Sequence, residues 1–349
     1  MLNIKYYWFL ILLILLTFYR LDLSCFSKEC PLEEATDKSF INLPIFIYIR
    51  EHCTNYIDKY FPSPYSELLL GMTVGLDRLS NVPNFKTALK QTGTIHVVVV
   101  SGFNISLVFN CIVSLLGSKY KLKNLFIAQF VTIIYALISG FEPPVLRALV
   151  MGSIISWGKY YGRGVDTLLV LVTSGLLMIV IQPLYFFSLS FILSFMATLG
   201  LILFSSLIVS LFKKVPFVLI DDFVAGLSAQ LLVWPIISYF FGTVSLISLV
   251  VNTLILWTVP FTTIFGTIYL MASFVSDFVA SLFLIPLYVL MNVFVEGVYF
   301  FNSLHVGYFL FKLTGYQLLA YYIFMTLFLI IINIRIFATK SNTVLNHDN

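Results

Sequence analysis

A histidine, a serine and an asparagine stand close together in TGTIHVVVVSGFN, residues 92–104, where the neighbouring residues are mostly apolar. Polar side chains are costly inside a bilayer, which makes His96, Ser101 and Asn104 functional candidates. The β-branched valines end at Ser101-Gly102, a weak point for a helix. We predict a helix break there, of the kind from which transporters build binding sites. In the alternative interpretation, His96 pairs with another helix and Gly102 permits close packing.

Arg147 is a second candidate, in SGFEPPVLRALVMG. The two prolines indicate the start of a helix and place Arg147 in its first turn. A cation there opposes the helix dipole, so an anionic substrate or Glu142 would have to favour it. The equally weighted alternative is that Arg147 snorkels to the lipid headgroups.

Three later segments carry polar residues at helical spacing. Ser194 and Thr198 belong to a hydroxyl stripe, for which we favour close helix packing over a site. Gln230 belongs to a second stripe. Asn252 and Asn292 are expected to be buried amides that line a path or pair across helices.

Motifs of a motor or a hydrolase are absent from the sequence. There is no G-x-x-x-x-G-K-[ST] phosphate loop and no G-x-S-x-G, and the four histidines lack metal-site spacing. We therefore expect no catalytic residue, no metal, no cofactor and no enzymatic activity.

The elements that carry these residues are predicted to be membrane helices. The 349 residues are 60% hydrophobic and only 10% charged, whereas soluble domains carry about 25% charge. The apolar runs are continuous, which favours helices over a barrel. We predict an all-α, polytopic integral membrane protein with about ten spanning or re-entrant helices of roughly 20 residues. They lie near residues 6–19, 93–117, 124–140, 145–160, 165–182, 187–212, 223–241, 244–272, 277–303 and 317–337. Kinks or breaks are expected at Pro235, Pro260 and Pro286.

Four segments are expected along the chain: an N-terminal transmembrane anchor (1–21), a short extracytoplasmic or interfacial segment (22–60), a membrane domain (61–338) and a disordered tail (339–349). The second segment contains either an amphipathic interfacial helix or a plain linker. It also holds Cys25, Cys30 and Cys53, for which a disulfide and reduced thiols are equally weighted.

Basic residues indicate the orientation. With ten spans they all fall on one side: Lys5, Lys119, Lys121, Lys123, Lys159, Arg163, Lys213, Lys214, Arg335 and Lys340. The positive-inside rule makes that side the cytoplasm, so both termini are expected there.

Four ordered motifs resemble the ComEC-type competence protein family. They are LLLG followed by TGTIH and SGFNI, then SGFEPPVLRALVMGSI, then QPLYFFSLSFILSFMATLG, and last LSAQLLVWPIISYFFGTVSLISLVVN. The resemblance runs from Phe61 to the last span. It implies motif positions at His96, Ser101, Gly102, Asn104, Arg147, Ser194, Gln230 and Asn252. Asn104 stands where many members have a second histidine, and asparagine does not titrate, so a proton-linked role there is in doubt.

The resemblance implies a channel in the bacterial inner membrane that passes single-stranded DNA into the cytoplasm during natural transformation. Implied partners are that strand, a surface DNA receptor or pilus machinery, a separate nuclease, a cytoplasmic helicase and membrane lipid; a homodimer is left open. The nuclease is implied because the metallo-β-lactamase-like domain of many members is absent here, as is room for their OB-like domain. Two other functions stay open: a permease for a small anionic or nucleotide-like solute, and a membrane scaffold for a nuclease.

Overall fold

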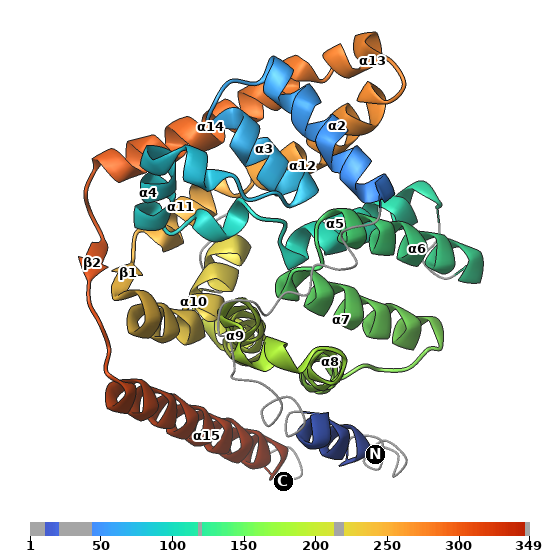
Figure 1. Ribbon diagram of the computed structural model, residues 1–349. Helices are drawn as coiled ribbons and strands as arrows, with labels where there is room; N and C mark the ends of the chain where they lie inside the picture. The colour runs from blue at the N-terminus through green and yellow to red at the C-terminus, as the bar shows by residue number, and fades with distance from the viewer. Residues whose placement is uncertain (1–10, 21–43, 118–120, 213–219, 346–349) are drawn as a thin grey trace.

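The computed structural model describes residues 11–20, 44–117, 121–212 and 220–345, with side chains up to residue 332. It is nearly all helical (Figure 1). After a helix at Ile11–Arg20 come α2 (Pro44–Tyr60), α3 (Tyr65–Val74), α4 (Pro83–Thr92), α5 (Gly102–Leu115), α6 (Leu122–Ile138), α7 (Pro143–Tyr160), α8 (Thr167–Ile181), α9 (Leu189–Phe212), α10 (Ile220–Phe241), α11 (Ser248–Ile255), α12 (Thr258–Ser273), α13 (Asp277–Ser281), α14 (Leu284–Ser303) and α15 (Gly315–Leu345). Some predicted features lie outside the described residues: Lys5, Cys25, Cys30, Lys119, Lys213 and Lys214.

The all-α prediction is confirmed, but the count of about ten spans is not. Within the described residues, five helices are long and apolar enough to cross a membrane, or six if α11 and α12, bent by 49°, form one broken span. The apolar helices α6 and α8 have only 17 and 15 residues. At ~1.5 Å per residue they fall short of the roughly 30 Å hydrocarbon core.

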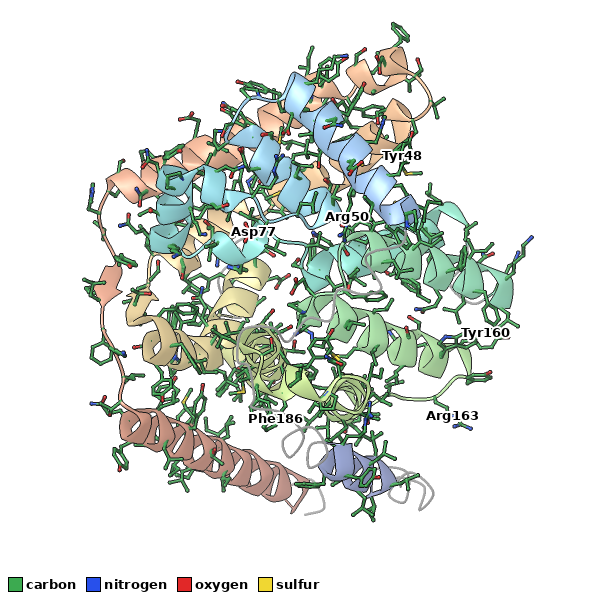
Figure 2. The ribbon with its side chains drawn as sticks, viewed as in Figure 1. Tyr48, Arg50, Asp77, Tyr160, Arg163 and Phe186 are labelled. Atoms are coloured by element: carbon green, nitrogen blue, oxygen red, sulfur yellow. The ribbon has the colours of Figure 1, made fainter. Side chains whose placement is uncertain are left out.

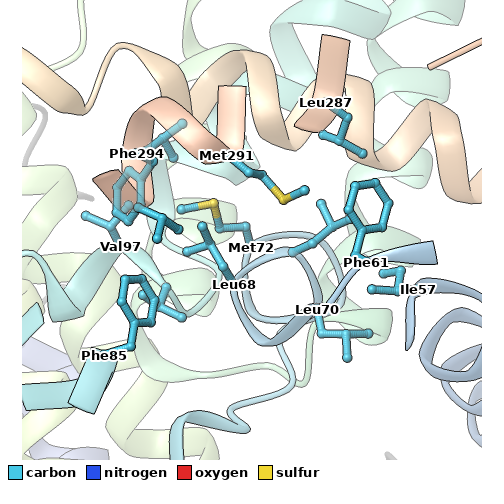
Figure 3. Packing of buried hydrophobic residues seen from close by; sticks show 14 of the residues in the cluster. Ile57, Phe61, Leu68, Leu70, Met72, Phe85, Val97, Leu287, Met291 and Phe294 are labelled. Atoms are coloured by element: carbon cyan, nitrogen blue, oxygen red, sulfur yellow. The ribbon is translucent and has the colours of Figure 1, made fainter. Parts of the chain in front are cut away.

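The largest hydrophobic core surrounds α3. Every residue from Ser66 to Val74 is buried there, so the helix has no outer face. Figure 3 shows Leu68 and Met72 of α3 pointing toward Met291 and Phe294 of α14. Helices α2, α4, α11 and α12 complete this core. This ten-residue helix lies at the centre of the core, and the interrupted elements pack around it.

A short strand and a helix break correct two predicted spans. Strand β1 (Thr243–Ser245) pairs antiparallel with β2 (Tyr308–Leu310), so the expected helix at 244–272 begins as a strand. The expected helix at 277–303 is likewise two helices, α13 and α14. Hydropathy gave both segments as single runs because apolar residues continue through each break.

Two of the three prolines confirm the predicted breaks. Pro260 and Pro286 are each the third residue of a helix, α12 and α14, that follows an interruption. The first-turn N–H groups of a helix have no acceptor within it, so proline is tolerated there.

Pro235 differs, because α10 continues through it. Proline cannot donate to the carbonyl four residues earlier, which here belongs to Leu231. The Tyr321 hydroxyl of α15 donates to that carbonyl at 2.8 Å. Its neighbour Tyr322 donates to the Leu232 carbonyl at 2.7 Å. The hydrogen-bond donor that α10 lacks at Pro235 is therefore supplied by α15, which runs along the edge of the molecule (Figure 1).

Helix α2 packs against the protein along one face. Cys53, Tyr56 and Ile57 are buried, while Ile45 and Tyr48 on the other face are exposed. Residues 44–60 are thus helical, and the interfacial placement of this helix stays a prediction. Cys53 is a free thiol, and burial raises its pKa to about 11, so it is protonated at neutral pH. With Cys25 and Cys30 outside the described residues, the disulfide stays a prediction.

Arg50 of α2 caps the C-terminus of α6. Its Nε and Nη2 donate to the Ile138 carbonyl at 3.0 and 2.7 Å. A cation at the C-terminus of a helix is favoured by the dipole and pairs an orphan carbonyl. The turn into α7 follows at once, with Gly140 at φ 96° and Phe141 at φ 51°. Arg50 therefore helps to set the turn that leads to Arg147.

We predict that Tyr321→Phe lowers the free energy of unfolding by roughly 1 kcal/mol, because the Leu231 carbonyl loses the donor that Pro235 cannot replace. Tyr322→Phe is the matched control. Its acceptor, the Leu232 carbonyl, faces Ile236, whose N–H lies within the same helix. Thermal unfolding in detergent measures both variants. Equal losses for the two would contradict this role for Tyr321.

Candidate functional site

The predicted helix break is present. A 3-10 turn at Ile95–Val97 is followed by irregular backbone, and α5 begins at Gly102. Ser101 is the N-cap, with extended φ −98° and ψ 166°. The break rests on α3, since a Cβ at Gly71 would lie 2.1 Å from the carbonyl oxygen of Val98. Only glycine lets the two backbones approach this closely.

Asn104 ties the broken helix to α3. Its side chain is fully buried, and Nδ2 donates to the Met72 carbonyl at 3.3 Å. Its Oδ1 has no hydrogen-bond partner among the described residues. One half of the amide is therefore structural, and the other half is an acceptor still available inside the membrane domain.

Arg147 joins three helices. Its Nη1 donates to the Ser194 carbonyl and to Thr198 Oγ1, both on α9. On the other side, a Cβ at Gly102 would meet Arg147 Nη2 at 2.9 Å and the Pro144 carbonyl oxygen at 3.1 Å. The guanidinium thus fills the space left by the first residue of α5. Arg147 is directed at α9, which the snorkelling alternative does not predict. We call Gly102, Arg147, Ser194 and Thr198 the Arg147 cluster.

Gln230 lies in a second polar group. Its Nε2 donates to Ser248 Oγ at 3.0 Å, which joins α10 to α11. Ser248 Oγ donates to the Ser245 carbonyl at 2.6 Å. Ser245 Oγ in turn donates to the Gln91 carbonyl at 2.7 Å. A Cβ at Gly93 would lie 2.4 Å from Ser248 Cβ, so the turn before the break packs on this group. We call Gly93, Gln230, Ser245 and Ser248 the Gln230 cluster.

A close helix crossing connects the two clusters. A Cβ at Gly200 of α9 would lie 2.3 Å from the Ser228 carbonyl oxygen of α10. The Arg147 cluster reaches α9 from one side, and the Gln230 cluster leaves α10 on the other. Contacts therefore run from α5 through α7, α9, α10 and α11 and return to the turn at Gly93, just before α5. The predicted residues lie in one closed series of elements, in two groups.

His96 and Asn252 complete the predicted set. The His96 side chain is exposed, and its Nδ1 lies 3.1 Å from the Gly93 carbonyl of its own turn. A carbonyl only accepts, so Nδ1 carries the proton in this contact. Asn252 lies one turn after Ser248 on α11, and its Oδ1 is buried without a partner in the described chain. His96 thus keeps an accessible side chain beside the break.

Buried, unpartnered polar atoms gather at the predicted positions. Within the described residues such atoms belong to ten side chains, and five of these are predicted positions: Asn104, Arg147, Ser194, Gln230 and Asn252. A buried polar atom left unpaired costs about 1–3 kcal/mol. These five side chains therefore have buried polar atoms that could pair with water or with a ligand.

Sequence reasoning missed Ser245, Ser248 and Gly93. The serines follow Gln230 at separations that no helical period links, since a strand and a turn intervene. Gly93 was visible only as part of the TGTIH run. No local pattern could have shown that Ser248 of α11 packs against Gly93 where a Cβ would otherwise lie. Among the described residues, no group of three or more His, Cys, Asp or Glu side chains could hold a metal ion.

Comparison with known proteins identifies the family. The Competence protein family matches residues 72–335 of the 349. The chain belongs to this Competence protein family. ComE operon protein 3 of Bacillus subtilis (strain 168) is 28% identical over 218 residues, which cover 62% of this chain and 27% of that protein. The uncharacterized protein YcaI of Escherichia coli (strain K12) is 30% identical over 113 residues, or 29% of this chain and 15% of that protein. No solved structure matches.

The relatives bound what the similarity covers. The aligned region spans about a quarter or less of each of these two relatives, at 27% and 15% of their lengths. The matched family region begins at Met72, inside α3, and contains both polar clusters. The family assignment therefore applies to the membrane domain in which the candidate site lies.

Gly102→Ala is expected to destabilise the protein by about 1–3 kcal/mol, because the new methyl group would displace Arg147 or the start of α7. Gly152→Ala on α7 is the matched control. Its Cβ would have nothing within 4 Å. That variant should be unchanged or gain up to about 1 kcal/mol from helix propensity. Thermal unfolding in detergent compares them, and a neutral Gly102→Ala would rule out the tight contact.

Proposed function

We propose that this membrane protein passes single-stranded DNA across the bacterial inner membrane during natural transformation. Membership of the Competence protein family supports a role in DNA uptake. The observation that carries the channel itself is the set of buried, unpartnered polar atoms at Asn104, Arg147, Ser194, Gln230 and Asn252. A strand or its hydration shell would give these atoms partners along one series of helices. Broken helices that line such a path are tolerated in a membrane because the path satisfies their backbone.

Arg147 is the residue to which we assign phosphate contact. A strand is a polyanion, and a single guanidinium in a low-dielectric site attracts one phosphate at a time without trapping the chain. Neutral amides and hydroxyls at the other positions would allow it to slide. Its hold on α9 through Ser194 and Thr198 keeps the guanidinium in place.

Direction and energy come from elsewhere in this proposal. Moving anionic charge into an inside-negative cell opposes roughly 2.3 kcal/mol per charge per 100 mV. The sequence has no phosphate loop, so we assign the pulling to a cytoplasmic helicase and strand degradation to a separate nuclease. A surface receptor or pilus machinery would deliver the DNA. The protein itself would be a conduit without enzymatic activity.

In this proposal, the basic residues support the assignment of one end of the protein to the cytoplasm. Phe126 near the start of α6 contacts Trp157 near the end of α7, at 5.0 Å between ring centroids. Lys121 and Lys123 therefore lie at the same end of this helix pair as Lys159. By the positive-inside rule we assign that end to the cytoplasm.

A permease for a small anionic solute is the second candidate, and the isolated Arg147 favours it. One guanidinium between three helices fits one carboxylate or phosphate as well as it fits a strand. Purified protein in vesicles distinguishes the two functions. Accumulation of a nucleotide with exclusion of a labelled 20-mer oligonucleotide would replace the channel with a permease.

We predict that Arg147→Ala lowers DNA uptake by about ten- to a hundredfold, the effect of losing charge-assisted hydrogen bonds worth about 1.5–3 kcal/mol. Arg147→Lys should restore part of it, because one ammonium keeps the charge but not the fork geometry. The assay counts transformants and labelled cytoplasmic DNA in a deletion strain complemented with each variant at matched membrane levels.

Arg78→Ala is the control for that experiment. Arg78 forms an exposed 2.9 Å ion pair with Asp58, and such pairs contribute about 0–1 kcal/mol. We expect its uptake to equal that of the wild type. Wild-type uptake in the Arg147→Ala strain would contradict a site at Arg147. Wild-type uptake in the deletion strain itself would overturn the proposed function.

A further inference from the structure

Four aromatic rings contact one another at the C-terminal end of α7. Phe126 and Trp157 have ring centroids 5.0 Å apart, and Trp157 lies 6.1 Å from Tyr160. Tyr161 stacks beside Trp157 at 6.3 Å, with ring planes 28° apart, and contacts Tyr160 at 5.2 Å. Phe126 and Tyr161 are 55% and 66% exposed, so the group presents open rings rather than a sealed core. We call these rings the α7 aromatic cluster.

Cations lie on both sides of this cluster. Lys121 and Lys123 precede it on α6, and Lys159 and Arg163 flank it at the end of α7; all four side chains are exposed. Figure 2 shows Tyr160 at the C-terminal end of α7 and Arg163 in the loop that follows, directed away from the ribbon.

The loop after the cluster is open around Arg163. A Cβ at Gly162 or Gly164 would have nothing within 4 Å, so a large ligand can approach the backbone on either side. One carboxylate, Asp166, follows in this loop. Its Oδ1 accepts from the N–H groups of Leu168 and Leu169, at 2.9 and 3.2 Å, and so caps α8. This carboxylate is thus engaged by the N-terminus of α8 rather than by the cations.

We propose that the α7 aromatic cluster, with Lys159 and Arg163, is a binding surface for single-stranded nucleic acid. Bases stack on Tyr161 and Trp157, and the two cations contact the adjacent phosphates. Exposed rings next to cations are the combination that sequence-independent strand binding uses. This inference rests on the proposed function, because it places the surface where the strand leaves the membrane domain.

The position on α7 connects the surface to the candidate site. Arg147 is the fifth residue of α7 and Lys159 lies in its last turn, about 18 Å apart at ~1.5 Å per residue. One helix thus carries the half-buried Arg147 near its N-terminus and the aromatic surface at its C-terminus. Anionic lipid would also pair with the cations, but headgroups offer no base to stack on Tyr161.

Photo-crosslinking tests the location directly. The full-length protein, in nanodiscs of zwitterionic lipid, is irradiated with an oligo-dT that carries bromodeoxyuridine. We expect crosslinked peptides from residues 157–163. Crosslinks confined to other segments would overturn the proposal.

Binding of a fluorescein-labelled oligo-dT 20-mer tests the chemistry. Tyr161→Ala should weaken binding by about tenfold, within the range of one lost stacking contact, while Tyr161→Phe should bind normally. Lys159→Ala with Arg163→Ala should lower the slope of log K against log salt by about 1.4, or 0.7 for each phosphate contact. Phe278→Ala is the matched control, since that ring is 75% exposed but lies beside Asp277; its binding should equal the wild type.

Two results would overturn the proposal. One is unchanged oligonucleotide affinity in Tyr161→Ala. The other is a loss that appears only with vesicles of anionic lipid, which would make the surface a membrane anchor. Either result would leave the proposed function standing if the deletion strain still failed to take up DNA, so the two failures can be told apart.

Discussion

The helix break before Gly102 depends on Gly71 of α3, where a Cβ would lie 2.1 Å from the carbonyl oxygen of Val98. A helix interrupted inside a membrane exposes backbone groups that lipid cannot pair, so protein or a lined cavity must receive them. Here α3 receives the break. It is buried from Ser66 to Val74, has a glycine where the two backbones approach, and its Met72 carbonyl accepts a hydrogen bond from Asn104. Larger side chains at Gly71 would push the break off this support.

The positions of the two polar clusters follow from this support of the break by α3. Because α5 begins at Gly102, Arg147 can lie beside it and reach Ser194 and Thr198 on α9. Because α4 ends at Gly93, which has no side chain, Ser248 can pack against it. Ser248 Oγ then accepts a hydrogen bond from Gln230 on α10. The crossing of α9 and α10 at Gly200 joins both sides. Small residues at each of these points let helices approach closely, and the polar side chains that remain are held in fixed positions.

The sequence was informative wherever the physics is local. A valine run ending at Ser101-Gly102 predicts a weak helix, and the break is there. Prolines at 260 and 286 mark helix starts. Arg147 in the first turn of a helix was recognised as needing a partner, although the carbonyl and hydroxyl of α9 could not be named. Pro235 shows the limit most clearly, because its compensation comes from Tyr321, distant in sequence.

Long-range features were not predictable from one sequence. Continuous hydropathy hid the strand at 243–245 and the interruption before α14. The contacts of Ser245 and Ser248 depend on how α11 folds back against α4, which no period encodes. The division of predicted residues into two clusters, with Asn104 turned toward α3, also depends on packing.

The central claim is that the unpartnered polar positions face a path that a strand occupies. The most direct measurement is protection of Asn252→Cys, at a half-buried position, from a water-soluble thiol reagent during DNA uptake, in a protein whose native cysteines are replaced. We expect labelling without DNA and protection when a strand is stalled by a bulky end group. Labelling that is absent in both states, or unchanged by the stalled strand, would contradict the account.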